Sequence, residues 1–234
     1  MLEVKGLKSG YGRVPVLRGV DLTLQSGECI GLLGRNGMGK TTLLRAVMGE
    51  LPAWDGDIRK DGTSLTGAST QTRARAGIGY VPQGKQLFKL LTVEENLRMG
   101  CVKKFRTAPP RSAEVLGLFP RLVPLLERPA GMLSGGEQQL LALGRCLCGE
   151  PDLILLDEPT EGIQPNICDE IIDVLIRLRK EKSLSIILVE QDIDFLWSIC
   201  DRVLAIDKGS VSKTIDPGAE GSTEEAKAFI GIEG

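Results

Sequence analysis

Residues Gly34-Arg35-Asn36-Gly37-Met38-Gly39-Lys40-Thr41 match the pattern G-x-x-x-x-G-K-[ST] with every defined position filled. An apolar run at residues 29–33 precedes the motif as a buried strand would, and a helix-forming run at residues 42–48 follows it. A strand, a tight turn and a helix start form the context in which such a loop holds phosphate. Its glycines let backbone amides curl around an anion, and the helix N-terminus adds free N–H donors. The stretch therefore predicts an α/β fold with a phosphate-binding loop.

The polar residues of this loop have separate expected roles. We expect Lys40 to reach the β- and γ-phosphates and the Thr41 hydroxyl to ligate Mg²⁺. The alternative is a glycine-rich turn that binds nothing, but such a turn has no need of a Lys-Thr pair at the helix start. The candidate nucleotide contacts are continuous in the chain: Gly34, Arg35, Asn36, Gly37, Met38, Gly39, Lys40, Thr41 and Thr42. A nucleoside triphosphate with Mg²⁺ is the expected ligand.

An acidic pair follows a second apolar run. Residues 153–156 are aliphatic and read as a buried strand that ends in Asp157 and Glu158. Ligands of α/β proteins bind at the carboxyl ends of such strands. Asp157 suits a role in holding Mg²⁺ through water, and Glu158 is placed where it could polarise an attacking water. An acidic pair after a strand can also cap a helix, but beside an intact phosphate loop the chemical roles are favoured.

Composition limits the classes of function. The chain has 234 residues and a formal net charge of −2, and it has no long Lys/Arg run, so a surface that tracks nucleic acid is not indicated. No apolar stretch approaches the roughly 20 residues needed to span a bilayer. Residues 1–5 read as a first strand rather than a signal peptide, so we expect a soluble protein made in the cytoplasm. The absence of histidine removes the commonest general base and zinc ligand.

The order of the patterns indicates one α/β unit with a helical insertion. The first thirty residues alternate apolar and polar positions with glycine turns, as a β-rich sheet edge does. From residue 152 onward strand and helix patterns alternate, which implies a parallel sheet with helices on its faces. We predict a single domain over residues 1–234, with a core from 1–83 and 149–234 and a helical subdomain from 84–148.

Four local features carry their own predictions. Residues 55–62 contain two Asp-Gly pairs around a short run, which suggests a hairpin. Thr92 resembles a helix N-cap with a carboxylate three residues later at Glu95. Residues 111–127 read as a helix broken by prolines, and residues 222–234 read as a short terminal helix without an assigned role.

A third motif points to a family. Leu133-Ser134-Gly135-Gly136-Glu137-Gln138-Gln139 precedes a helical run and resembles the LSGGQ signature of ATP-binding cassette (ABC) ATPases, with Glu137 at its fifth position. A Ser hydroxyl, small residues and a helix N-terminus make a second anion site. The resemblance implies that Ser134, Gly135, Gly136 and Glu137 contact ATP held by the opposite subunit. A second ABC ATPase subunit, the same or different, is therefore an expected partner.

The resemblance covers essentially the whole chain and extends to weaker landmarks. It implies an ABC-type nucleotide-binding domain with an antiparallel β edge, a RecA-like core and the helical subdomain, and ATP as the nucleotide. Tyr11 stands where an aromatic side chain stacks on adenine, although a lone tyrosine is more often a partly buried aromatic. Gln83 matches the glutamine that senses Mg²⁺ and the attacking water. Residues 87–97 resemble the part of importer cassettes that contacts the membrane subunit.

Two departures from the family pattern narrow the subfamily. Residues 161–165 read Glu-Gly-Ile-Gln-Pro where the family usually has Ser-Ala-Leu-Asp, and Gln191 stands in place of the switch histidine. A glutamine amide can donate a hydrogen bond to a γ-phosphate oxygen but cannot carry a proton charge. Both departures resemble the branched-chain amino acid and urea or short-amide importer cassettes, and residues 34–40 lean towards the urea branch.

The resulting hypothesis is the ATPase subunit of an importer, favouring urea or short amides, with a branched-chain amino acid importer as the alternative. It implies integral membrane permease subunits, an indirect solute-binding protein, no nucleic acid, and a peripheral position on the cytoplasmic face of the inner or plasma membrane. Glu158, Gln83 and Gln191 are the expected catalytic residues, and Thr41, Gln83 and Asp157 the expected Mg²⁺ contacts. A soluble ABC ATPase of DNA repair or translation usually has coiled-coil inserts or tandem cassettes, which are not seen here. A small-molecule kinase would have no use for residues 133–138.

Overall fold

The computed structural model describes residues 2–101 and 112–231, and its first layer is an antiparallel sheet in the strand order β2-β1-β4-β5. The predicted β-rich edge is confirmed, with two long strands before residue 25. Of the two Asp-Gly pairs, Asp61-Gly62 forms the hairpin turn with positive φ at both residues, whereas Asp55-Gly56 begins a strand. The strands are β1 (Leu2–Tyr11), β2 (Val14–Leu24), β4 (Asp55–Lys60) and β5 (Thr63–Ser64).

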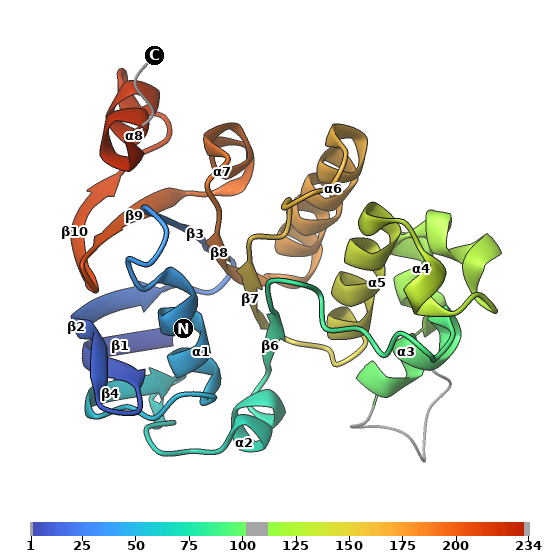
Figure 1. The fold of residues 1–234 in the computed structure, drawn as a ribbon, viewed down its shortest axis with the longest axis horizontal. Coiled ribbons are helices and arrows are strands. Elements are labelled where there is room, and N and C mark those ends of the chain that lie inside the picture. The colour runs from blue at the N-terminus through green and yellow to red at the C-terminus, as the bar shows by residue number, and fades with distance from the viewer. Residues whose placement is uncertain (1, 102–111, 232–234) are drawn as a thin grey trace.

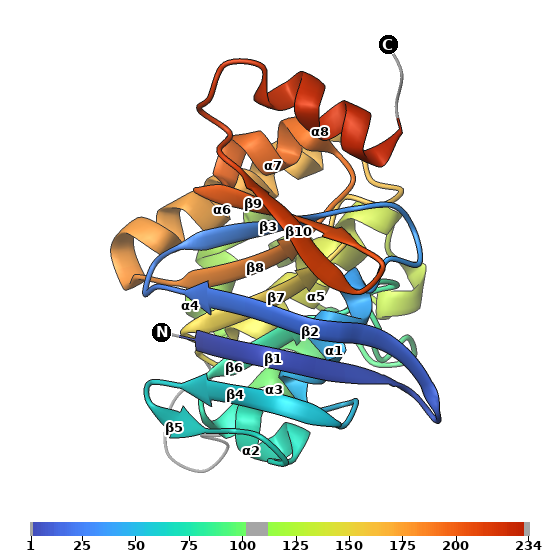
Figure 2. The same ribbon diagram turned by 90° about the vertical axis from the view of Figure 1, so that its left-hand side faces the viewer.

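The second layer is a six-stranded sheet in the order β10-β9-β3-β8-β7-β6, parallel except for β10 (Figure 2). Every residue of β3, β7 and β8 is buried, as expected for strands covered on both faces. The predicted parallel sheet is confirmed, and it aligns the carboxyl ends of its neighbouring strands. The strands are β3 (Cys29–Leu33), β6 (Ile78–Val81), β7 (Leu153–Asp157), β8 (Ser185–Val189), β9 (Arg202–Asp207) and β10 (Ser210–Ile215).

Helices cover this sheet and form a cluster at one end of the molecule, where α3, α4 and α5 gather away from the antiparallel sheet (Figure 1). The α-helices are α1 (Lys40–Met48), α2 (Thr70–Arg75), α3 (Val93–Gly100), α4 (Ser112–Leu118), α5 (Gly135–Leu147), α6 (Pro165–Lys182), α7 (Ile193–Ile199) and α8 (Ser222–Ile230). Two 3-10 turns, η2 (Pro120–Leu125) and η3 (Ala130–Met132), lie between α4 and α5.

Two local helix predictions can be compared with the structure. The predicted cap of α3 is confirmed, since the Thr92 hydroxyl accepts from Glu95 N–H and the Glu95 carboxylate accepts from Thr92 N–H. The helical run predicted from residue 111 to 127 is broken by its prolines, as expected, and residue 111 lies outside the described residues. Helix α4 ends at Leu118 and a 3-10 turn containing Pro124 follows, because proline cannot donate the α-helical hydrogen bond.

The core has two apolar clusters, and β3 separates them. Cys29 and Leu33 belong to the cluster that includes α5, α6 and α7, whereas Ile30 and Leu32 belong to the cluster under α1 and the antiparallel sheet. This division follows from the alternation of side chains along a strand. The loop that follows β3 therefore emerges from a strand that is fixed from both faces.

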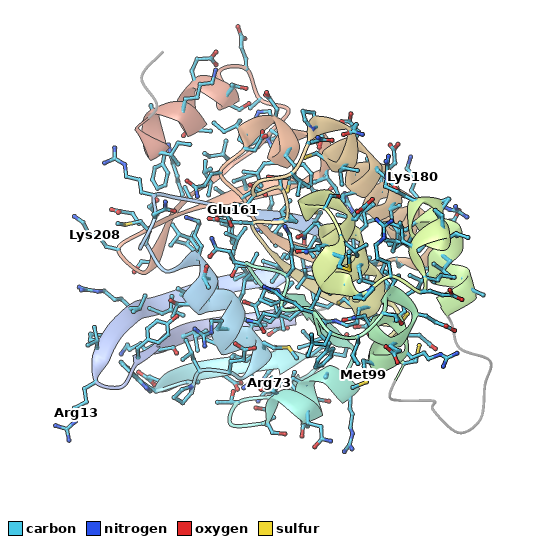
Figure 3. The ribbon with its side chains drawn as sticks, turned by 45° about the vertical axis from the view of Figure 1, so that its right-hand side comes forward. Arg13, Arg73, Met99, Glu161, Lys180 and Lys208 are labelled. Carbon is cyan, nitrogen blue, oxygen red and sulfur yellow. The ribbon has the colours of Figure 1, made fainter. Side chains whose placement is uncertain are left out.

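Helix α1 is also fixed at its far end. Arg73 of α2, labelled in Figure 3, is 2% exposed and donates from Nη1 to the carbonyls of Ala46 and Val47 at 2.9 and 2.8 Å. Both carbonyls belong to the last turn of α1, where α-helical partners run out, and that of Ala46 also accepts from Gly49 N–H at 3.1 Å. Burial lowers the pKa of the Arg73 guanidinium, and its hydrogen bonds compensate for the lost hydration. The helix that begins at the phosphate loop therefore has an anchored C-terminus.

Candidate nucleotide-binding site

The loop between β3 and α1 leaves the first turn of α1 without a side-chain cap. Gly39 takes the N-cap position at φ 108°, and Gly37 also has positive φ at 80°. A Cβ at Gly34 would lie 2.4 Å from the carbonyl oxygen of Ile206, so only glycine fits there. The first turn of α1 holds no acidic residue. Its N–H groups and the positive end of the helix dipole are therefore available to an anion.

Lys40 is the buried cation of this loop, and its ammonium group bonds to the loop's own backbone. Its Nζ donates to the carbonyls of Gly34 at 2.6 Å and Arg35 at 3.1 Å. Burial lowers the pKa of Lys40, while the nearby carboxylates of Glu158 and Asp157 oppose that shift. A desolvated cation with two carbonyl partners has an unneutralised charge to offer a phosphate.

Asp157 ends β7 beside the first turn of α1. Its carboxylate accepts from the Thr41 hydroxyl at 3.0 Å and from the Tyr80 hydroxyl at 3.3 Å. Burial raises the pKa of Asp157, and the hydrogen bonds from Thr41 and Tyr80 act against that rise. Burial also raises the pKa of the Tyr80 phenol, which therefore remains a donor. A hydroxyl and a buried carboxylate beside a phosphate loop are hard oxygen ligands that fit Mg²⁺.

Glu158 stands between two glutamine amides. Gln83 Nε2 donates to one carboxylate oxygen at 3.1 Å, and Gln191 Nε2 donates to the other at 2.9 Å. Gln191 Nε2 also donates to Asn36 Oδ1 at 3.1 Å, and Gln83 Nε2 reaches Glu161 at 3.0 Å. The structure thus brings together residues predicted from four distant segments.

The backbone at Glu158 is strained and held in place. Its φ is 49°, in the left-handed region, and its N–H donates to the carbonyl of Val189 at 2.9 Å. Strain of this kind persists where the surroundings over-determine a functional geometry.

Glu190 is a positioning residue that sequence reasoning missed. It is 3% exposed, and one carboxylate oxygen accepts from Thr160 Oγ1 at 2.6 Å and from Thr160 N at 2.9 Å. The other oxygen accepts from Gln191 N at 2.9 Å. Glu190 therefore links the segment after β7 to the segment after β8, which fixes Gln191 relative to Glu158. An acidic residue directly after an apolar strand was the available signal, the same signal that identified Asp157.

Tyr11 lies at the end of β1 with its side chain 41% exposed. Arg45 of α1 stacks over its ring at 5.5 Å from the centroid and donates to its hydroxyl at 3.3 Å. Arg45 also pairs with Glu50 at 3.0 Å, so the guanidinium is held from two sides. An ordered, exposed aromatic ring beside α1 suits stacking against a flat base.

The signature segment forms a second helix start, at α5. Ser134 is the N-cap, its hydroxyl accepts from Glu137 N–H at 3.3 Å, and the Glu137 carboxylate accepts from Ser134 N–H at 2.8 Å. A Cβ at Gly136 would lie 2.9 Å from Ile167 Cγ1, which accounts for that glycine. Within the described residues, no hydrogen bond or ion pair joins residues 134–137 to residues 34–42. The chain therefore presents two separate candidate anion sites.

A phosphate loop, an acidic strand end and a second helix start carrying the signature define a P-loop ATPase of the cassette type. The family model described as ABC transporter matches residues 17–161. The chain belongs to this family, whose ATP-binding cassettes are ATPases coupled to transport.

Named relatives agree with this assignment. The high-affinity branched-chain amino acid transport ATP-binding protein BraG of Pseudomonas aeruginosa is 40% identical, over 90% of this chain and 91% of BraG. The probable branched-chain amino acid transport ATP-binding protein LivF of Archaeoglobus fulgidus is 34% identical, over 91% and 90% of the two chains.

A solved structure supports the fold. The ATP-binding cassette MJ0796, as a dimeric post-hydrolysis state bound to ADP and Pi, has a TM-score of 0.85 at 24% identity, over 94% of this chain and 100% of that one. Across residues 2–101 and 112–231, no helix is long and apolar enough to cross a membrane.

Proposed function

We propose that this chain energises the import of branched-chain amino acids. The observation that carries the proposal is the 40% identity to BraG, which extends over nine tenths of both chains. The LivF relative has the same named solute class. These relatives favour the alternative solute over the urea or short amides towards which the motif of residues 34–40 leaned.

The proposed catalytic unit is a pair of cassettes. The phosphate loop and the signature helix of one chain present separate anion surfaces, so each ATP would lie between the loop of one subunit and the Ser134–Gly135–Gly136 segment of the other. The dimeric state of MJ0796 supports this arrangement. The partner is a second cassette, identical or related.

Within one half-site, we assign the phosphates to Lys40 and the loop amides, and the adenine to Tyr11. Thr41 and Asp157 would hold Mg²⁺, which supplies charge neutralisation at the phosphates. Glu158 would accept the proton of the attacking water. The amides of Gln83 and Gln191, which already flank its carboxylate, would keep it aimed and report the γ-phosphate.

The permease would dock in a groove of about 970 Å³, which is lined by residues of α2, β6, α3 and α5. Phe88 and Met99 line it with exposed side chains, and Arg145 lies over the Phe88 ring at 5.4 Å from the centroid. Met99, labelled in Figure 3, belongs to α3 of the helical cluster. An apolar groove with a few polar groups suits a short helix of a membrane subunit. We propose that residues 84–148 form the subdomain that moves with it, on the cytoplasmic face of the membrane.

Uptake assays test the solute. Cells that lack this chain should regain uptake of labelled leucine when the wild-type chain is returned, and should not regain it with Glu158→Gln. Urea uptake should be the same in all three strains. Restored urea uptake with unchanged leucine uptake would reverse the assignment in favour of urea.

A further inference from the structure

The C-terminal helix α8 is tied to the body of the molecule along its length. Trp197 Nε1 donates to Ser222 Oγ at 3.2 Å, and Lys213 pairs with Glu225 at 2.6 Å. Lys213 also lies over the Phe229 ring at 5.4 Å from its centroid, and Ala226 is fully buried. These contacts fix the position of α8 and of the residues at its far end.

The far end of α8 contacts the phosphate loop. Gly231, the C-cap of α8 at φ 78°, lies so close to Arg35 that a Cβ there would be 2.4 Å from Nη2, 3.0 Å from Cζ and 3.3 Å from Nε. All three distances are short, so the guanidinium group lies against the end of the helix. A cation at a helix C-terminus is attracted by the negative end of the helix dipole. Figure 2 shows this end of α8 on the same side of the molecule as the blue loop after β3.

The loop is also held by the β9–β10 turn. Gly209 N–H donates to the carbonyl of Met38 at 3.0 Å, and Lys208 N–H donates to the Met38 sulfur at 3.4 Å. The carbonyl of Arg35 in turn accepts from Lys40 Nζ at 3.1 Å. Two segments of the last thirty residues thus contact the loop. Arg35 links the α8 contact to Lys40, because its side chain lies against Gly231 and its carbonyl accepts from Lys40 Nζ.

We propose that the end of α8 is a positioning element of the nucleotide site, which holds Arg35 and so keeps the phosphate loop in its binding conformation. This inference rests on the proposed phosphate-binding role of residues 34–42. Holding the loop before ATP arrives reduces the ordering cost of binding, so the contact raises ATP affinity. We expect it to leave the chemical step unchanged, because among residues 2–101 and 112–231 no hydrogen bond or ion pair joins α8 to Glu158, Gln83 or Gln191.

The two ends of α8 offer a matched pair of variants. Gly221 and Gly231 have nearly equal φ, 77° and 78°, so alanine strains the backbone equally at both. A Cβ at Gly221 meets nothing within 4 Å, whereas a Cβ at Gly231 displaces Arg35. We expect Gly231→Ala to raise the KM and Kd for ATP about fivefold relative to Gly221→Ala, with kcat unchanged. A change of this size lies within the interaction energies usually measured between two residues in contact. The backbone strain should cost both variants a similar amount of thermal stability.

A double-mutant cycle checks that the effect passes through Arg35. In an Arg35→Ala background, Gly231→Ala should weaken ATP binding no more than Gly221→Ala does. If alanine prevents folding, Gly→Asn at the same two positions repeats the comparison, since asparagine tolerates the left-handed region.

Equal ATP affinity of the two glycine variants, or tighter binding by Gly231→Ala, would overturn the inference. Failure of the proposed phosphate-binding role of residues 34–42 is a different result: the wild-type chain would then bind no ATP, and Lys40→Ala would change nothing.

Discussion

The starts of helices α1 and α5 are the two candidate anion sites of the chain, but they are built in opposite ways. At α1 the N-cap is a glycine without a side-chain bond, no acid lies in the first turn, and Lys40 is buried beside it. At α5 the Ser134 hydroxyl and the Glu137 carboxylate close a capping box on each other. The first N–H groups of α1 have no side-chain acceptor and no acid nearby in the helix, so a phosphate would complete them. At α5 the capping box already supplies acceptors. The comparison suggests that the first surface binds ATP and the second meets it only when two cassettes close.

The largest expected effect comes from replacing Glu158, the proposed general base, while the starts of α1 and α5 stay unchanged. Glu158→Gln should leave ATP binding intact and lower kcat by roughly 10²- to 10⁴-fold, the usual contribution of a general base. ATP should then stabilise the closed dimer, measured by light scattering with and without ATP. The control is Glu161→Gln, which removes another acceptor of the Gln83 amide. An unchanged hydrolysis rate for Glu158→Gln would remove the residue from the mechanism.

The next effect removes the charge of the α1 surface alone. Lys40→Ala should weaken ATP affinity of the isolated chain about 10²-fold, since each charge-assisted hydrogen bond contributes about 1.5–3 kcal/mol. Titration calorimetry measures the affinity, and Lys180→Ala on the exposed face of α6 is the matched loss of one positive charge. If both lysine variants bind ATP equally well, the α1 surface does not hold the phosphates.

The two surfaces could be predicted from sequence because each lies within one contiguous motif. The phosphate loop, the strand before Asp157 and the signature all have short-range patterns, and the parallel sheet followed from their alternation. The links between them could not be predicted, because they join residues far apart in the chain. The Gln83–Glu158 bond spans 75 residues, and the contacts of Glu190 with Thr160 span 30. The contact of the last helix with Arg35 spans nearly the whole chain, and no local pattern indicates it.

A smaller effect separates the anion role of α5 from its structural role. Ser134→Ala should lower the hydrolysis rate about tenfold and leave ATP affinity of the isolated chain unchanged, while the lost cap costs about 1 kcal/mol of stability. Thr92→Ala is a close control, because Thr92 and Glu95 form the same capping box on α3. Both variants should lose similar stability by thermal melting, and only Ser134→Ala should lose activity. Equal activity losses would reduce the α5 start to an ordinary helix cap.

The smallest effect tests whether the ionised carboxylate of Asp157 beside α1 destabilises the chain when no cation is bound. Burial raises the pKa of Asp157, so the folded chain binds a proton there more strongly than the unfolded chain does. Stability should therefore fall as the pH rises from the ordinary value of 3.8 through the raised pKa, and the ionised carboxylate remains unfavourable at neutral pH.

Asp157→Asn removes that charge and should raise the melting temperature of the nucleotide-free chain at pH 7 by about 2–4 °C, which corresponds to about 1 kcal/mol for a chain of this size. The gain should vanish below the ordinary pKa, where wild type is protonated as well. With ATP and Mg²⁺ the order should reverse, because only the wild-type carboxylate gains a cation. Melting curves of both proteins over a pH series measure all three, and a variant less stable than wild type at pH 7 without nucleotide would show that the Thr41 and Tyr80 bonds outweigh burial.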